Sequence, residues 1–549
     1  MLSRNAQYLN PGISPVTKTG HLSLLTDLSR DPVFLKGRIK NGPTFAAAML
    51  ILGKIVKTSA RQGQKDHSAY QEWVQGKYLE EIEDVRAERL AQLPALKSRH
   101  AELRALIKEV EAEIQEASDK LNDQKAIRRY WDWLYDYNRE AWIVIDPIVS
   151  VQPDATFFEG FSLDESIYVR VKLPNECVEA EEPIQPGTTN IDFGLGLEKE
   201  FARVRSYRPL DIEIGLSSVQ IETEIGSAVE KKIELPESWV RGLLEVQSAS
   251  TIASTHLEVS PVFMAEIIAR LEEEKEKNGP RSLRFKLVPG KPITVELEPW
   301  GTELSDPKSN YDGSEPSEIR VWGRRRLLLL KDILPDAEAV KIGFIGSGMP
   351  SFWTVNVNET ELQLGLSGWT SLDWASRARF AAFLPKGDLS ESQLTRISAL
   401  LKSHGMISAR ELSAEANFPL KTVSSGLMTL CGAGKALFDS ELGVYRWREL
   451  YPEFNPSLIM EASLEERKGL ELIEENAVNI ENLEELENGI RISAIVHDKN
   501  AEQVEAELDL DGRVIYAECS CSHFKFHKLR EGPCRHMVAV ISHEGSDTE

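Results

Sequence analysis

The stretch that decides the fold of the C-terminal part of this chain is VIYAECSCSHFKFHKLREGPCRHMVAVISHE, residues 514–544. Residues Val514–Cys519 are typical of a short strand. Gly532 and Pro533 then predict a turn. A helical apolar pattern follows directly, with Met537, Val538, Val540 and Ile541 on one side. The stretch therefore predicts a strand, a loop, a turn and a helix.

Three of the five cysteines of the chain fall within this stretch. Residues two apart on a strand share a face, so Cys519 and Cys521 can aim both thiolates at one point. Cys534 and His536 lie on the turn and the start of the helix, where their side chains can converge. Three thiolates and one imidazole complete a tetrahedron around Zn²⁺. Because four protein ligands leave no position for water, we expect one structural zinc ion and no catalytic one.

The alternative is a group of buried unpaired thiols. A lone CxC or CxH motif is weak, but both motifs occur here in order and twelve residues apart in a cysteine-poor chain. The fourth ligand has alternatives in the sequence, since His523, His527 and His543 also lie near the cysteines. His536 is preferred because it stands beside Cys534.

The loop between the two cysteine pairs is basic and aromatic. One interpretation is a phosphate-binding patch, with Phe524 and Phe526 stacking on bases. The other is that the cations neutralise the thiolates while the two aromatic rings fill a small core. The cations concerned are Lys525, Lys528, Arg530 and Arg535. The sequence does not separate these interpretations.

Composition indicates an ordinary globular protein of three or four domains. The chain has 549 residues and a net charge of −23, with 87 acidic against 64 basic residues. This charge repels phosphate backbones on average, so contact with nucleic acid would need a local basic patch. Five cysteines, two of them isolated, do not indicate a disulfide scaffold. Neither a signal peptide nor a bilayer-spanning stretch is visible, and we expect a cytoplasmic protein without membrane contact.

The N-terminal part divides into two segments. Residues 1–66 are expected to form a strand-helix region, and residues 67–140 a charged helical hairpin or coiled coil. Within it the spacing of Leu103, Ile107, Val110, Ile114, Ala117 and Leu121 is that of a coiled-coil seam. Pro94 interrupts the pattern. An antiparallel hairpin packed on itself is favoured over an intermolecular coiled coil because the seam is short.

Residues 141–385 are expected to form one β-rich α+β body. Its sequence consists of short runs of residues typical of strands, separated by turns rich in Pro, Gly and Asp. A helix is predicted over Pro261–Lys277, and residues 302–317 are expected to form a polar surface loop. Strands are predicted over Asp211–Ile214, Val219–Thr223, Leu283–Val288, Ile293–Glu298, Val340–Ile345 and Trp353–Val357.

Residues 391–450 are typical of a winged helix. Helices are predicted over Gln393–Ser403, from the cap Ser408 to near Asn417, and over Lys421–Gly432, followed by a two-stranded wing. The third helix offers base edges only Lys421, Thr422, Ser424 and Ser425. That is a poor set for reading DNA, so a structural or protein-binding role is favoured over DNA docking. Residues 451–549 are expected to form a C-terminal domain with the zinc finger at about 488–543.

Taken together, CxC, a loop, CxH and an apolar helix resemble the SWIM-type zinc finger. The fuller phrase, ECSC at 518–521 and HKLREGPCRHMVAV at 527–540, is similar to a bacterial family of SWIM zinc finger proteins. The resemblance extends over most of residues 31–543, although the helical segment at 67–130 departs from it. The stretches that carry it are DPIVSVQPDATFFEGFSLDES (146–166), NGPRSLRFKLVPGKPITVELEPW (278–300), IRVWGRRRLLLL (319–330), GSGMPSFWTV (346–355), GLSGWTSLDW (365–374) and VYRWREL (444–450).

This resemblance implies a zinc-binding protein that is not an enzyme. Members are often encoded beside a MoxR-type AAA+ ATPase and a von Willebrand A protein, which implies protein partners of these two kinds. SWIM fingers in general are credited with binding DNA or proteins. These implications rest on the resemblance alone.

Other candidates for chemistry are weak. The glycines of 343–348 follow a strand, but Met349-Pro350 comes next and no helix opens there, so a turn is expected. The run Arg324–Arg326 is expected to be a solvated turn of a helix and not a patch that binds phosphate or an acidic partner. Four carboxylates cluster in sequence without a pairing that would make a hydrolase: Asp154, Glu159, Asp164 and Glu165. No nucleophile–base arrangement is visible among Ser347, Ser367, His256 and His404.

The sequence therefore predicts an α+β multidomain protein. It comprises an N-terminal helical region with a coiled-coil-like segment, a β-rich central body, a winged helix and a C-terminal ββα SWIM zinc finger. The expected role is a non-enzymatic adaptor that binds protein, nucleic acid or both. The alternatives are a DNA- or RNA-binding protein that uses the finger and winged helix, and third a hydrolase in the central body.

Overall fold

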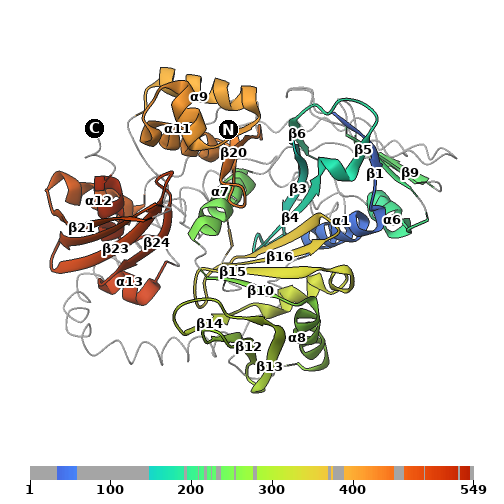
Figure 1. Ribbon diagram of the computed structural model, residues 1–549, viewed down its shortest axis with the longest axis horizontal. Coiled ribbons are helices and arrows are strands. Elements are labelled where there is room, and N and C mark those ends of the chain that lie inside the picture. The colour runs from blue at the N-terminus through green and yellow to red at the C-terminus, as the bar shows by residue number, and fades with distance from the viewer. Residues whose placement is uncertain are drawn as a thin grey trace, which may run out of the picture.

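The computed structural model shows a mixed α+β chain built around several sheets (Figure 1). It describes residues 34–58, 147–190, 195–207, 209–214, 219–223, 226–229, 237–252, 255–275, 281–368, 373–374, 389–450, 463–486, 489–529 and 532–544. The coiled-coil-like segment expected at 67–130 lies outside these residues. None of the helices within these described residues combines the length and the hydropathy that spanning a bilayer requires.

The first strand and helix begin a five-stranded sheet. Pro43 lies in the first turn of helix α1 (Gly42–Val56), where a missing N–H breaks no helical hydrogen bond. Helix α6 (Leu195–Arg203) packs beside α1. The sheet has the order β5-β1-β7-β8-β9, with strands β1 Leu35–Ile39, β5 Val178–Ala180, β7 Leu210–Ile214, β8 Val219–Thr223 and β9 Gly226–Val229.

An eight-stranded antiparallel sheet forms the centre of the body. On one face Val169, Leu364 and Trp353 are fully buried, and Phe45 of α1 contacts Phe158 edge-on. The order is β10-β15-β16-β17-β4-β3-β2-β6, with β2 Ile148–Val151, β3 Ala155–Phe161, β4 Ile167–Pro174, β6 Gly187–Asn190, β10 Thr255–Val259, β15 Ala339–Phe344, β16 Ser351–Val357 and β17 Thr360–Leu366. Gly343–Gly348 leads from β15 towards β16, and no helix opens there.

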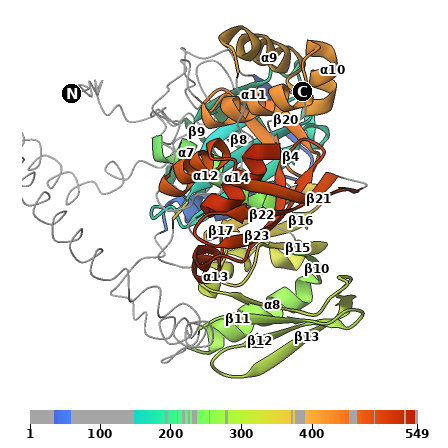
Figure 2. The ribbon, with the colours of Figure 1, turned by 90° about the vertical axis from the view of Figure 1, so that its left-hand side faces the viewer.

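A four-stranded sheet lies beside this body (Figure 2). Its order is β13-β12-β11-β14, with β11 Leu283–Leu287, β12 Pro292–Leu297, β13 Thr302–Asn310 and β14 Ser317–Val321. The expectation of a surface loop over 302–317 is therefore wrong, because most of it is strand β13. Leu304 and Asp306 point inward while their neighbours face water. Asp306 accepts hydrogen bonds from the backbone N and hydroxyl of Ser260, which caps helix α8 (Pro261–Glu273).

The arginine run at 324–326 is not a solvated turn, contrary to expectation. It opens a 3₁₀ segment, Arg324–Leu330, in which Arg324 is 1% and Arg326 is 5% exposed. Arg326 donates to the carbonyls of Ser166 and Gly368. Arg325 donates to two carbonyls near the end of α8, at 2.7 and 2.8 Å. The three cations therefore satisfy backbone carbonyls that burial would otherwise leave unpaired.

Residues 391–447 form three helices and a small sheet. Helix α9 (Glu391–His404) and helix α10 (Ala409–Ala416) each begin with a capping box, at Ser390 and Ser408. Helix α11 spans Leu420–Gly432. The sheet has the order β18-β20-β19, with β18 Met406–Ile407, β19 Ala436–Asp439 and β20 Val444–Trp447.

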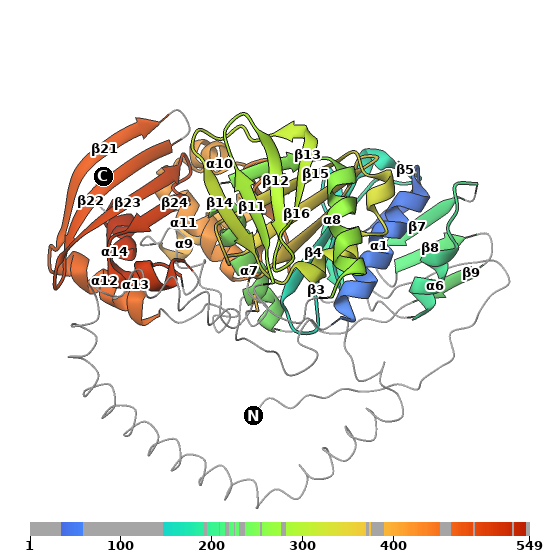
Figure 3. The ribbon, with the colours of Figure 1, turned by 90° about the horizontal axis from the view of Figure 1, so that it is seen from below.

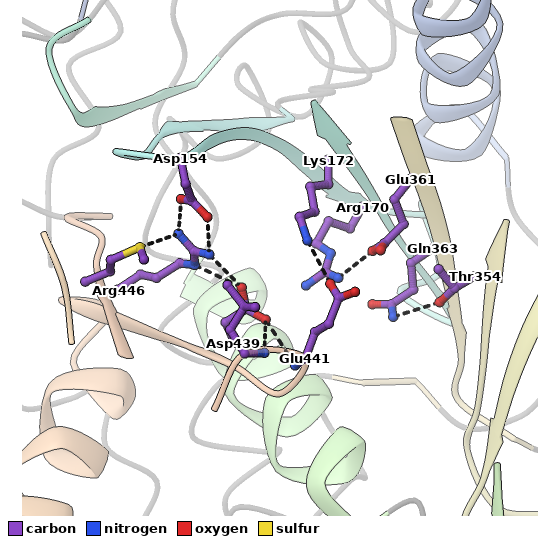
Figure 4. A network of polar contacts seen from close by, with 11 residues as sticks. Asp154, Arg170, Lys172, Thr354, Glu361, Gln363, Asp439, Glu441 and Arg446 are labelled. Carbon is purple, nitrogen blue, oxygen red and sulfur yellow. Dashed lines mark hydrogen bonds and ion pairs between the residues drawn. The ribbon is translucent and has the colours of Figure 1, made fainter. Parts of the chain in front are cut away.

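The hairpin β19–β20 is anchored to the central body by ion pairs (Figure 4). Arg446 is fully buried and holds Asp154 of the body and Asp439 of the hairpin, the latter at 2.9 Å. Lys172 of β4 pairs with Glu441 at 2.7 Å. Burial alone would raise the pKa of Asp439, but Arg170 and Arg446 lower it below its usual value. The hairpin therefore links residues 391–447 to the central body.

Helix α7 (Glu237–Ile252) packs against α11, β19 and the C-terminal sheet, and so connects three parts of the chain (Figure 1). Arg513 enters the same junction from the C-terminal sheet. Its guanidinium carbon lies 3.7 Å from the ring centre of Phe438 in β19. Asp509 pairs with its other side at 2.6 Å. This geometry is that of a stabilising cation–π contact.

The C-terminal unit is a four-stranded meander with helices on it (Figure 3). Its strands are β21 Val478–Leu486, β22 Gly489–His497, β23 Ala501–Asp509 and β24 Val514–Cys519, and its helices are α12 Leu464–Glu474, α13 Ser522–His527 and α14 Arg535–Glu544. Helix α14 packs on the sheet, and α12 packs on α14. A Cβ at Gly469 of α12 would lie 2.7 Å from Val538, so the two helices approach closely there.

We predict that Arg448→Met destabilises the body. Arg448 is 1% exposed, and its Nη1 donates to Glu159 at 2.6 Å; Glu159 also accepts from the Tyr168 hydroxyl. Removing one partner leaves a buried charge unpaired, so we expect a loss of about 3–5 kcal/mol in the free energy of unfolding, measured by urea denaturation. The control Arg491→Met, at a solvent-accessible ion pair, should lose much less stability, because water screens that pair. Equal losses in the two variants would contradict this.

Candidate metal centre

Four side chains converge where the C-terminal sheet meets its helices. The ligand atoms of Cys519, Cys521, Cys534 and His536 all lie within 4.8 Å of one another, and all four residues are buried. The Nδ1 atom of His536 is 3.7 Å from the sulfur of Cys519 and 3.9 Å from that of Cys534. A tetrahedral zinc ion with bonds of about 2.3 Å to sulfur and about 2.0 Å to nitrogen spaces its ligands roughly 3.5–3.8 Å apart.

The first two ligands come from the end of a strand and the start of a helix. Cys519 ends β24, while Cys521 is the N-cap of α13. The expectation that both share one face of a strand is therefore wrong, although both sulfurs still reach one point. The turn between them is fixed by Ser520, whose backbone N donates to Gln503 at 2.9 Å and whose hydroxyl donates to Glu502 at 2.6 Å.

Backbone N–H groups point at the sulfurs. The amide of Cys521 donates to the sulfur of Cys519 at 3.5 Å, and the amide of Phe524 donates to the sulfur of Cys521 at 3.4 Å. Such bonds stabilise thiolates over thiols. They are formed by the turn and helix themselves, so the fold prepares two of the three sulfurs for a cation.

The other two ligands flank the start of α14. Cys534 is 1% exposed and precedes the helix, and its carbonyl accepts from the amide of Val538 at 3.1 Å. His536 is the second residue of α14. Between them Arg535 points away, and its Nε and Nη2 donate to Glu465 of α12 at 3.1 and 2.8 Å. The alternatives His523, His527 and His543 are not part of the cluster.

Without a cation the three sulfurs cannot all carry charge. A hydrogen bond with Cys521 and burial raise the pKa of Cys519 to about 12. Neighbouring Cys519 and Cys521 also raise the pKa of Cys534 well above its ordinary value. Cys521 accepts from both thiols, which lowers its pKa. A divalent cation relieves this crowding of negative charge, so the donor set fits one structural Zn²⁺.

The aromatic and basic residues beside the cluster divide between the two sequence interpretations. Phe524 is buried at 6% exposure and so fills the core, with Lys528 above its ring at 4.9 Å. Arg535 is engaged by Glu465. Lys525 is exposed and Phe526 is half-buried. Arg530 lies outside the described residues. Base stacking by Phe524 is therefore excluded in this arrangement.

Residues outside the motif also approach the centre, and sequence reasoning did not find them. Glu465 stands far from the cysteines in sequence, and Asp498 lies on the turn between β22 and β23, with a carboxylate oxygen 3.5 Å from Nε2 of His536. Neither belongs to a spacing pattern. Only the tertiary packing of α12 and of this turn brings them near.

Comparison with known proteins agrees with the geometry. The SWIM zinc finger family model matches residues 503–545. No curated protein matches the chain.

Three solved structures are similar to this chain at 10–12% sequence identity. Proliferating cellular nuclear antigen from Entamoeba histolytica is 12% identical, with 40% of this chain and 88% of that chain covered and a TM-score of 0.29. The PCNA2–PCNA3 complex from Sulfolobus tokodaii is 12% identical, with 42% and 92% covered and a TM-score of 0.28. A. fulgidus PCNA with the C-terminal region of FEN-1 is 10% identical, with 43% and 95% covered and a TM-score of 0.30. These scores are too low to carry an argument.

We predict that Cys534→Ser abolishes zinc binding and unfolds the chain from about residue 488 onward. Zinc contributes ~10–16 kcal/mol to the folding of small zinc modules, far more than so small a core supplies. Metal analysis should fall from one equivalent to none, and hydrogen exchange should accelerate in β22–β24 but not in β15–β17. Cys431→Ser, at a buried cysteine of α11, is the control and should keep its zinc. Unchanged exchange in β22–β24 of the Cys534 variant would contradict the prediction.

Zinc affinity should fall as the pH is lowered. In the metal-free protein the raised pKa values of Cys519 and Cys534 keep both sulfurs protonated at neutral pH, so zinc must displace protons to bind. As the pH falls from 8 to 6, we expect the Kd for zinc to rise about tenfold per pH unit for each proton that zinc displaces. Competition with a chromophoric chelator measures this, and a pH-independent Kd would refute it.

Proposed function

We propose that this protein is a non-enzymatic, zinc-stabilised adaptor that binds other proteins. The observation that carries the proposal is the burial of α11. In a DNA-reading winged helix, the third helix presents its side chains to the major groove. Here Ser424 and Ser425 are 1% and 4% exposed, so two of its four candidate contact positions are covered.

The order of elements in residues 391–447 supports a winged-helix fold used for packing. Three helices are followed by the hairpin β19–β20, the order of that fold. The face of α11 that holds Met428 and Cys431 lies against Leu244 of α7. The hairpin is tied to the body through Arg446 and Lys172. Helix α11 and the hairpin β19–β20, which would contact a DNA duplex in a DNA-binding winged helix, therefore both make contacts within the chain.

Three of the four carboxylates that cluster in the sequence have structural roles. Asp154 pairs with Arg446, and Glu159 with Arg448 and Tyr168. Asp164 accepts from the hydroxyls of Ser162 and Ser166 at 2.8 and 2.9 Å. Side chains held in this way are poorly placed to act as general acid or base. These engagements favour the adaptor over the hydrolase.

By family resemblance, we extend the proposal to a cytoplasmic recognition or scaffold subunit of a bacterial assembly. Its partners in that assembly would be a MoxR-type AAA+ ATPase or a von Willebrand A protein. The contacts of Arg446 and Arg513 support a scaffold role. They hold the central body, residues 391–447 and the C-terminal unit together, so that the three parts can present one larger surface.

A second candidate is nucleic-acid binding through the finger. Lys525 and Lys528 are exposed on and after α13, and Phe526 is half-buried beside them. Such a site would contact phosphate without reading base edges. The overall charge of −23 opposes it.

We predict that the zinc-loaded chain, purified with a tag from its native organism, retains an ATPase or von Willebrand A protein. Cys534→Ser should lose that partner, because the finger unfolds, whereas Cys177→Ser should retain it. Recovery of the chain alone, with zinc bound, would contradict the adaptor role.

The nucleic-acid candidate is tested separately on heparin and labelled duplex DNA at low salt. We expect no retention that depends on Lys421 of α11. If the finger contacts phosphate, Lys525→Ala with Lys528→Ala should reduce binding and its salt dependence. Binding lost in Lys421→Ala instead would show that α11 reads DNA and would overturn the protein-binding interpretation of this unit.

A further inference from the structure

The histidine of the zinc centre has an unmatched polar atom. Its Nδ1 faces the sulfurs of Cys519 and Cys534, so the metal must bind at Nδ1. A neutral imidazole that coordinates through Nδ1 carries its proton on Nε2. In His536 this Nε2 is buried and has no hydrogen-bond partner among the residues that the structure describes. A buried donor without an acceptor is costly.

One acceptor stands opposite this atom. A carboxylate oxygen of Asp498 lies 3.5 Å from Nε2 of His536. This is longer than an ordinary hydrogen bond of about 2.7–3.2 Å. The side chain of Asp498 is 26% exposed and sits on a turn, so a small rotation can close the gap.

Asp498 has a second charged neighbour. The same carboxylate oxygen is 3.5 Å from Nη1 of Arg535. Arg535 is fixed in turn by Glu465 of α12, which accepts from its backbone N at 3.1 Å as well as from its guanidinium. Glu465 of α12, Arg535 and Asp498 therefore form a chain of charged side chains of alternating sign that ends at the imidazole of His536.

We propose that Asp498 is a positioning residue of the zinc centre, which accepts a hydrogen bond from Nε2–H of His536 when zinc is bound. A carboxylate in this position fixes the tautomer and ring orientation of a metal-binding histidine and makes it a better ligand. Asp498 lies outside the region 503–545 that matches the finger family. The functional zinc unit therefore extends beyond the finger to the β22–β23 turn. This inference depends on the zinc site and not on the adaptor role.

The test uses the full chain with Asp498→Asn, which removes the charge and keeps the size. Loss of such a partner costs about 10- to 100-fold in metal affinity, so we expect the zinc Kd to rise by that factor in chelator competition. The matched control is Glu505→Gln, an exposed carboxylate on β23 of the same sheet, which should bind zinc like the unaltered chain. An unaltered Kd in Asp498→Asn would overturn the proposal.

A second variant separates positioning from packing. Asp498→Glu keeps the carboxylate and should bind zinc more tightly than Asp498→Asn. If Glu weakens zinc binding as much as Asn, the position acts through its shape and the proposal fails. Hydrogen exchange at saturating zinc shows that each variant is folded before its Kd is compared.

The proton itself provides the most direct measurement. With ¹⁵N-labelled histidine in the zinc-loaded chain, His536 should show a protonated Nε2 whose proton exchanges slowly with water. In Asp498→Asn this exchange should be faster, while in Glu505→Gln it should not change. Coordination through Nε2, or equal exchange in all three proteins, would overturn the proposal.

Discussion

Convergence of three sulfurs and one ring nitrogen on one cation is the constraint on which the C-terminal unit depends. Two of these ligands sit at the junction of β24 and α13, and two at the start of α14. A cation bound there would fix the angle at which both helices leave the sheet. The apolar face of α14, with Met537 and Val540 fully buried, lies on the sheet at that angle. Helix α12 can then pack on α14 only because Gly469 lacks a side chain.

Buried guanidinium groups have a comparable role in the rest of the chain. Arg326 and Arg324 satisfy backbone carbonyls inside the body, and Arg446 and Arg448 join the hairpin to it. Each brings several donors in a fixed plane, which suits carboxylates and carbonyls that would otherwise be left unpaired. These contacts are directional, whereas apolar packing is not. The parts of the molecule are consequently held in defined orientations.

Local signals in the sequence were sufficient for the ligands and for many elements. Ser408 precedes a residue three positions on that completes a capping box, and the start of α10 was predicted from it, whereas α9 begins at Glu391, two residues before its predicted start at Gln393. The pairs Cys519–Cys521 and Cys534–His536 predicted, without any knowledge of the fold, the four side chains that the structure brings together.

What could not be predicted depends on tertiary contacts. Strand β13 has only two buried residues, Leu304 and Asp306, and the second is polar because it accepts hydrogen bonds from Ser260, the cap of α8. The sequence pattern therefore resembled that of a loop. Arg326 is buried because carbonyls from distant segments surround it. Asp498 meets His536 only after β22 and β23 pair. No spacing rule contains such information.

The contact of Arg513 with Phe438 of β19 means that the finger is not structurally independent of the rest of the chain. Its guanidinium group lies against Phe438, and Tyr445 lies 3.5 Å from one of its nitrogens. If the finger were excised or transplanted, this cation and the aromatic surface it covers would both be left facing water. A fragment that is meant to behave like the parent should therefore keep residues 237–252 and 391–450 together with the C-terminal sheet.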